Sequence, residues 1–140
     1  MVLSPDRLGL RWAVALGMLA LVAASTVVAA WSWREREEGR ERAVRLTGGD
    51  PGRGQGLIRT YGCAGCHTVP GVAGATGRAA PSLQGVAGRV WLAGVVSNTP
   101  ANMIRWIEDP RAIDPSTAMP PTGAHGRDAR DIAAYLYTLR

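Results

Sequence analysis

The chain has 140 residues, enough for one modest domain and a further segment. Its 16 basic residues are all arginine, and with 11 acidic residues they give a net charge of +5. Because these arginines form no basic stripe interleaved with aromatic residues, the charge does not indicate a nucleic-acid-binding protein.

The first predicted element is a membrane span within an N-terminal anchor, residues 1–33. Residues 12–33 carry no charge, and as a helix they would extend about 33 Å, enough to cross the hydrocarbon core of a bilayer. Tryptophans stand at both ends, as at membrane interfaces. A cleaved signal peptide is the alternative, since residues 28–30 read Val-Ala-Ala. The apolar run exceeds the usual signal core of about 7–15 residues, which favours an uncleaved anchor.

A charged linker is predicted over residues 34–49. It holds two glutamate–arginine pairs at helical i,i+4 spacing: Glu38 with Arg42, and Glu41 with Arg45. Gly39 weakens a helix here, and Gly48 and Gly49 should end it. We expect a solvated spacer. Arginines are more numerous after the span than before it, which by count alone places the C-terminal part in the cytoplasm, but the interleaved charges leave the orientation open.

Residues 50–140 are predicted to be all-α, with three short helices joined by loops rich in glycine and proline. Two helices should begin at Asp50 and Thr99, each a capping residue followed by proline. Asp128 should cap the last helix, and no alternating strand pattern is present. Because the core is thin and the chain has no phenylalanine, this domain needs a staple such as a disulfide, a metal or a cofactor.

The two cysteines of the chain stand in the stretch GCAGCHT, residues 62–68. A Cys63–Cys66 disulfide would close a trivial loop, and a catalytic dithiol would need a βαβ context that is absent. A zinc site would need His125, a loop residue, as its fourth ligand. Haem uses every group, with both thiols bonded to vinyl groups and His67 under the iron. The spacing therefore predicts one covalently attached haem c.

Met119 is predicted as the second axial ligand of the iron. It lies between loop prolines, in DPSTAMPPTG, without helical periodicity. Met103 falls on a helix stripe, where core packing explains it, and Met1 and Met18 belong to the N-terminal region. An isolated methionine on a stiff loop suits a haem ligand. His125 is the alternative ligand.

From residue 50 to residue 140 the chain resembles class I cytochromes c. Four stretches carry the resemblance, in the family's order: GQGLIRTYGCAGCHT, APSLQGVAGR, NMIRWIEDPRAIDPSTAMP and DIAAYLYTL. The chain is similar in particular to the cytochrome c domains fused to subunit II of bacterial terminal oxidases, but it lacks further cysteines for a dinuclear copper site. The resemblance implies a small class I cytochrome c fold around one haem. It implies thioether bonds and axial ligands at four positions: Cys63, Cys66, His67 and Met119.

The resemblance also implies a set of supporting contacts. The carbonyl of Pro81 should accept the other ring N–H of His67. Arg89 stands where the family often places a partner for a haem propionate, although a plain surface arginine is the alternative. Trp91 and Trp106 should either donate an indole N–H to a propionate or line the pocket. A further implication is that the first and last helices cross at Gly54 and Tyr135.

His/Met ligation leaves no open position on the iron, which implies a one-electron carrier and not an enzyme. Haem attachment of this kind takes place outside the bacterial cytoplasmic membrane. We therefore expect a single-pass protein of the inner membrane with its haem domain in the periplasm, serving a membrane-embedded respiratory complex, in the first place a terminal oxidase. An electron-accepting subunit of a periplasmic dehydrogenase is one alternative. A gas-binding haem protein is another, if Met119 dissociates.

Overall fold

The computed structural model describes residues 5–140, which divide into two compact units with their boundary in the chain between Glu37 and Glu38. Helix accounts for 62% of the residues and strand for 4%, which confirms the predicted helical class. Each unit is described by itself below.

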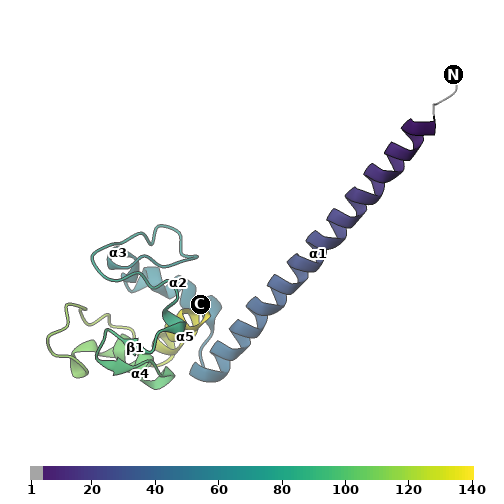
Figure 1. Cartoon of the computed structure of the whole chain (residues 1–140). Helices are drawn as coiled ribbons and strands as arrows, with labels where there is room; N and C mark the ends of the chain where they lie inside the picture. The colour runs from purple at the N-terminus through teal and green to yellow at the C-terminus, as the bar shows by residue number, and fades with distance from the viewer. Residues whose placement is uncertain (1–4) are drawn as a thin grey trace. The chain divides into compact units, whose positions relative to one another are not determined.

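The N-terminal unit is part of one long helix, α1 (Pro5–Thr47) (Figure 1). This helix contains a stretch long and apolar enough to cross a membrane, and none of that stretch is buried by the rest of the chain. The hydroxyls of Ser25, Thr26 and Ser32 donate to carbonyls three residues back, at 2.8, 2.8 and 2.9 Å. These polar side chains are therefore satisfied inside the helix, as a lipid environment requires.

The end of α1 differs from the expected solvated spacer. The helix runs unbroken through Gly39 and stops at Thr47, one residue before the first predicted glycine terminator. Ala43 and Thr47 are 1% and 5% exposed, so this part of α1 belongs to the packed C-terminal unit. The Thr47 hydroxyl donates to the Ala43 carbonyl at 2.8 Å and accepts from the Gly49 N–H at 3.1 Å, which secures the helix end. Burial of this face outweighs the modest cost of one glycine.

The C-terminal unit holds the remaining elements. They are α2 (Pro51–Thr60), α3 (Cys63–Cys66), η1 (Val86–Gly88), β1 (Trp91–Leu92), β2 (Val96–Ser97), α4 (Pro100–Glu108), η2 (Pro110–Ala112) and α5 (Gly126–Thr138). The antiparallel hairpin of β1 and β2 was not predicted, because strands of two residues are too short to show an alternating pattern. Its turn places Ala93 and Gly94 at φ of 50° and 78°, the left-handed conformation of tight hairpin turns.

Two of the three predicted helix caps are confirmed. Asp50 accepts the N–H groups of Gly52 and Arg53 at 2.8 and 3.3 Å, and Thr99 accepts that of Asn102 at 3.2 Å. The third prediction is wrong, because α5 begins two residues before Asp128. The N-cap residue of α5 is His125, and its side chain forms no capping hydrogen bond. Instead, Glu108 Oε1 accepts the Gly126 N–H at 2.8 Å.

The helices α2 and α5 pack directly against each other (Figure 1). A Cβ atom at Gly54 would lie 1.9 Å from the Asp131 carbonyl oxygen and 3.0 Å from Tyr135 Cβ. The crossing implied by the family resemblance is therefore present, with the backbone of Asp131 as the closest neighbour of the glycine. The ring of Tyr135 reaches past it, and its hydroxyl donates to the Pro70 carbonyl at 2.5 Å.

A buried carboxylate, Asp131, joins the start of α2 to α5. The side chain of Asp131 is 2% exposed, and its Oδ1 accepts the Asp50 N–H at 2.7 Å. Its Oδ2 accepts no hydrogen bond but lies 3.2 Å from Arg53 Nε and 3.9 Å from Arg127 Nε. The two guanidinium groups therefore compensate the buried charge as ion pairs. The backbone at Gly49 also packs closely against α5, since a Cβ atom at Gly49 would lie 2.2 Å from the Arg130 carbonyl oxygen.

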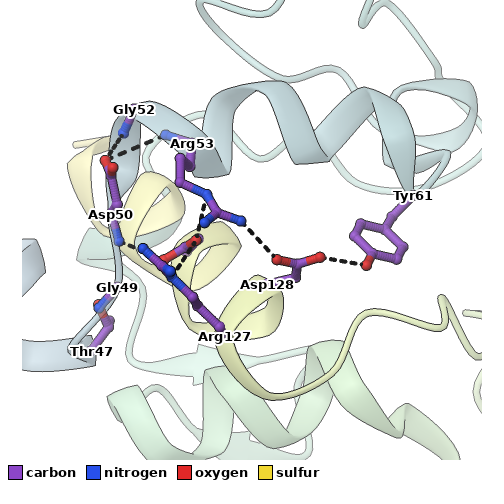
Figure 2. Close-up of polar contacts among 9 residues, drawn as sticks. Thr47, Gly49, Asp50, Gly52, Arg53, Tyr61, Arg127 and Asp128 are labelled. Carbon is purple, nitrogen blue, oxygen red and sulfur yellow. Dashed lines mark hydrogen bonds and ion pairs between the residues drawn. The ribbon is translucent and has the colours of Figure 1, made fainter.

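A second carboxylate, Asp128, extends the same polar network along α2 (Figure 2). Its Oδ1 lies 3.1 Å from an Arg53 guanidinium nitrogen, and its Oδ2 accepts the Tyr61 hydroxyl at 2.7 Å. The hydrogen bond to this carboxylate, followed by desolvation, raises the pKa of Tyr61. Arg53 thus contacts both acids of α5, and the network fixes α2 at both of its ends.

Asp131→Asn should lower the free energy of unfolding by about 1.5–3 kcal/mol, because it removes the charge that both arginines face. Unfolding of the full chain in detergent, followed by tryptophan fluorescence in denaturant, measures the change. Glu41→Gln is the control, since it breaks an exposed ion pair of 3.3 Å with Arg45, worth about 0.3–0.5 kcal/mol. Equal losses in the two variants would contradict a special role for the buried acid.

Candidate functional site

The two cysteines lie on a single short helix. The Cys63–Cys66 turn, α3, begins after Gly62, whose φ of 73° suits glycine, and the His67 N–H closes the turn on the Cys63 carbonyl at 2.9 Å. Both cysteines are free, and at i,i+3 spacing their sulfurs lie on one face. Burial raises the pKa of the Cys63 thiol, whereas a reactive dithiol requires a lowered pKa. The spacing of two free thiols on one helical turn therefore suits a pair of attachment points.

The imidazole of the histidine that follows is held by one hydrogen bond. His67 Nδ1 lies 2.6 Å from the Pro81 carbonyl oxygen. Because a carbonyl only accepts, Nδ1 must carry the proton, and Nε2 keeps its lone pair for a metal. A hydrogen bond from the ring nitrogen that does not bind the metal orients a ligand histidine and raises the basicity of its other nitrogen. The contact matches the one implied by the family resemblance.

The loop that carries Pro81 is fastened to the cysteine motif on both sides. The Ala80 N–H donates to the Cys66 carbonyl at 3.0 Å, and the Leu83 N–H donates to the Thr68 carbonyl at 2.9 Å. A Cβ at Gly77 would lie 2.6 Å from the Cys66 carbonyl carbon, so a glycine is needed where the loop crosses the motif. The position of Pro81 relative to His67 is therefore set by backbone contacts.

The predicted second ligand, Met119, lies on the loop between η2 and α5. It is half-buried and packs against the core, and its N–H donates to the Thr117 hydroxyl at 3.2 Å. Met103 is 2% exposed, inside the core, as its helix stripe predicts. His125, the alternative ligand, is exposed at the N-cap position of α5. These placements favour Met119 over His125.

Arg89 turns toward the segment next to Pro81 and is not a plain surface arginine. Its guanidinium donates to the Ser82 carbonyl and, at 3.1 Å, to the Gln84 carbonyl. Sequence reasoning missed the residue that supports it: Asn98 Nδ2 donates to the Arg89 carbonyl at 2.8 Å. Asn98 shows no sequence signal beyond its position before a helix cap, because its partner lies on another element.

The two candidate tryptophans differ in burial. Trp106 is 9% exposed and belongs to the core, whereas Trp91 is 54% exposed on the β1–β2 hairpin. Within residues 5–140, neither indole N–H donates a hydrogen bond to a protein group. Trp106 packs in the apolar core, and the parts that both tryptophans play at the haem stay predictions.

The donor set fits haem and not a metal ion held by protein ligands alone. Across the part of the chain that the structure describes, no three His, Cys, Asp or Glu side chains cluster as metal ligands. What the site offers is two free thiols one helical turn apart, an imidazole with an available Nε2, and a half-buried thioether on a proline-rich loop. These are the groups that a covalently attached haem uses.

Comparisons with known proteins show the family to which the chain belongs. The sequence model of the family described as "Cytochrome c" matches residues 52–140. Cytochrome c oxidase subunit 2 of Alkalihalophilus pseudofirmus is 29% identical over 89 residues, which are 63% of this chain and 25% of that protein. The match thus spans about a quarter of the relative's length, and no solved structure matches the chain significantly. By the extent of the family match, this chain belongs to the cytochrome c family, whose members bind covalently attached haem c and carry electrons.

Proposed function

We propose that this protein carries single electrons through one haem c that is attached at Cys63 and Cys66 and ligated by His67 and Met119. The hydrogen bond from His67 Nδ1 to the Pro81 carbonyl, 2.6 Å long, is the observation that carries the proposal. It fixes the tautomer in which Nε2 is free for iron. The bound haem supplies the reversible one-electron change.

The protein side chains tune this change and restrict it to electron transfer. The thioether of Met119 is a soft neutral ligand that favours ferrous iron and raises the reduction potential. Core side chains such as Met103, Trp106 and Ile107, all at most 9% exposed, keep water away and disfavour the extra charge of the ferric state. With an imidazole and a thioether both bound, no coordination position is open to a substrate.

We also propose that α1 anchors the protein in the bacterial cytoplasmic membrane as a single span, with the haem domain on the periplasmic side. Two observations support the anchor: the apolar length of α1 and the exposure of its apolar side chains. The attachment of haem c outside the cytoplasmic membrane supports the orientation. Electrons would then be exchanged only with partners at that surface.

The partner we propose is a respiratory terminal oxidase, with this chain as a subunit or as a tethered donor. The support is the 29% identity, over 89 residues, to a protein named cytochrome c oxidase subunit 2. With two cysteines, both in the haem motif, the chain shown offers no thiolates for a copper centre. Oxygen chemistry would therefore belong to the partner.

A haem-stained native gel of gently solubilised membranes tests the partner. We expect the haem of this chain to migrate with a large complex that is active for cytochrome oxidase in the gel. A Cys63→Ala/Cys66→Ala double variant is the control, because its band should lose the haem stain. Migration of the wild-type haem alone, near the mass of the single chain, would argue against a subunit of the oxidase.

A further inference from the structure

The loop that carries Met119 is held unequally on its two sides. Upstream, hydrogen bonds follow one another along the chain: Asp114 N–H to the Pro110 carbonyl at 2.9 Å, Thr117 N–H to the Asp114 carbonyl at 3.1 Å, and Met119 N–H to the Thr117 hydroxyl at 3.2 Å. Downstream, residues 119–125 have no regular secondary structure. Within the described chain, residues 118–124 form no backbone–backbone hydrogen bond at all.

A side-chain hydrogen bond fastens the downstream half of this loop to α4. The hydroxyl of Thr122 donates to the carbonyl of Ile107, in the last turn of α4, at 2.9 Å. The same oxygen accepts the N–H of Ala124 at 3.1 Å. Among the described residues, the bond from Thr122 to Ile107 is the one hydrogen bond that joins residues 118–124 to another element. The neighbouring Glu108 fastens the loop's far end, through the Gly126 N–H at 2.8 Å.

Two prolines connect this fastening point to Met119. Pro120 and Pro121 have φ fixed near about −65° and carry no N–H, so they absorb little rotation and cannot form replacement backbone hydrogen bonds. A displacement of Thr122 is therefore passed along the chain to Met119. The hydrogen bond from the Thr122 hydroxyl to the Ile107 carbonyl therefore restrains Met119 from the downstream side, together with the burial of Ala124, which is 0% exposed.

We propose that Thr122 is a positioning residue that controls how readily Met119 leaves the iron. The inference rests on the proposed ligation by Met119 and adds the device that keeps this ligand in place. The Thr122 hydroxyl hydrogen-bonds to Ile107 and Ala124 and is not part of the proposed ligand set. It acts by fastening the loop to the end of α4, so that opening of the loop requires loss of the hydrogen bond from the Thr122 hydroxyl to the Ile107 carbonyl.

Carbon monoxide is the probe, because it binds ferrous haem only when Met119 is displaced. At gas concentrations well below saturation, the binding rate is proportional to the population of the opened loop. Thr122→Val keeps the shape of the side chain and removes both hydrogen bonds, so the reduced full-length holoprotein should bind carbon monoxide about 5- to 30-fold faster than wild type. The red absorption band of the iron–thioether bond, measured in the ferric protein, should also weaken.

Three further variants separate positioning from general destabilisation. Thr122→Ser restores the hydroxyl and should return the rate to within about twofold of wild type. Thr138→Val removes a half-buried hydroxyl that bonds within α5, at 2.6 Å to the Tyr135 carbonyl, and should leave the rate unchanged. Pro121→Gly, at an exposed position, keeps the fastening but adds a flexible joint before it, and should accelerate binding too.

The outcomes distinguish this inference from the proposed ligation. Faster binding in Thr122→Val and Pro121→Gly, with unchanged rates in Thr122→Ser and Thr138→Val, supports a positioning role. If Met119→Ala binds gas rapidly while Thr122→Val and Pro121→Gly both match wild type, the inference is overturned and the ligation stands. If Met119→Ala matches wild type as well, both are wrong. Should Thr122→Val fail to yield holoprotein, Pro121→Gly decides alone.

Discussion

Replacing Gly54 with alanine should severely destabilise the C-terminal unit. A Cβ at this position would lie 1.9 Å from the carbonyl oxygen of Asp131 and 2.6 Å from its carbonyl carbon. Both are backbone atoms of α5, so no rotamer change relieves the clash, and α2 and α5 would have to separate. We expect a loss of more than about 4 kcal/mol in the free energy of unfolding, a large part of the stability of an ordinary domain, about 5–15 kcal/mol.

Gly56→Ala provides a matched control on the same helix. A Cβ at Gly56 would meet no atom within 4 Å, so alanine should stabilise the protein by about 0.5–1 kcal/mol through its helix propensity. Denaturant unfolding of the haem-loaded chain, and the yield of haem-loaded protein in membranes, measure both variants. A Gly54→Ala protein within about 1 kcal/mol of wild type would show that the two helices cross elsewhere.

Replacing Met119 with alanine should convert the protein from an electron carrier into a gas-binding haem protein. The iron would lose its thioether, the red iron–sulfur band would disappear, and the reduction potential would fall, because a soft neutral ligand that favours ferrous iron is gone. Carbon monoxide should bind about 10- to 1,000-fold faster, since the wild-type opened state is a minor conformation populated at about 0.1–10%. Absorption spectra, a redox titration and stopped-flow gas binding check the three changes.

Met103→Leu is the control for this experiment. Met103 is 2% exposed in the core, and a swap to leucine nearly conserves its volume, at a cost below about 1.5 kcal/mol. The red band and the slow gas binding should remain. Loss of the band in Met103→Leu together with its persistence in Met119→Ala would assign the thioether ligand to the wrong methionine.

Local chemistry made much of the fold predictable. Asp50 and Thr99 indicate helix starts, because each is a capping residue followed by proline. Each capping side chain binds a backbone N–H within four residues. Asp128 has the same appearance but serves Arg53 and Tyr61, which are 75 and 67 positions away. No local pattern distinguishes a cap from such a long-range partner, and the predicted start of α5 was wrong for that reason.

The end of α1 shows a similar limit. Gly39 correctly marks a weak position in an isolated helix, yet the helix continues to Thr47 because Ala43 and Thr47 are buried in the C-terminal unit. Burial against a distant element cannot be inferred from a window of charged residues. The solvated-spacer interpretation therefore fails for the last turns of this helix.

In the candidate site, too, local groupings were predictable from the sequence pattern and contacts between distant residues were not. The attachment motif is contiguous, so spacing alone predicted Cys63, Cys66 and His67 as one group. The contact between His67 and Pro81 spans 14 positions and followed from the family resemblance alone. The contact between Thr122 and Ile107 spans 15 positions, and no residue pattern indicates it, because a threonine in a glycine- and proline-rich loop is ordinary.

The proposal of a six-coordinate electron carrier is tested most directly by adding carbon monoxide to the reduced wild-type full chain in detergent. We predict that the spectrum changes slowly and incompletely, because Met119 holds the position that the gas must take. A fast and complete change to the carbon monoxide spectrum would contradict this account. The haem would then have an open coordination position, and gas binding would replace electron transfer as the proposed function.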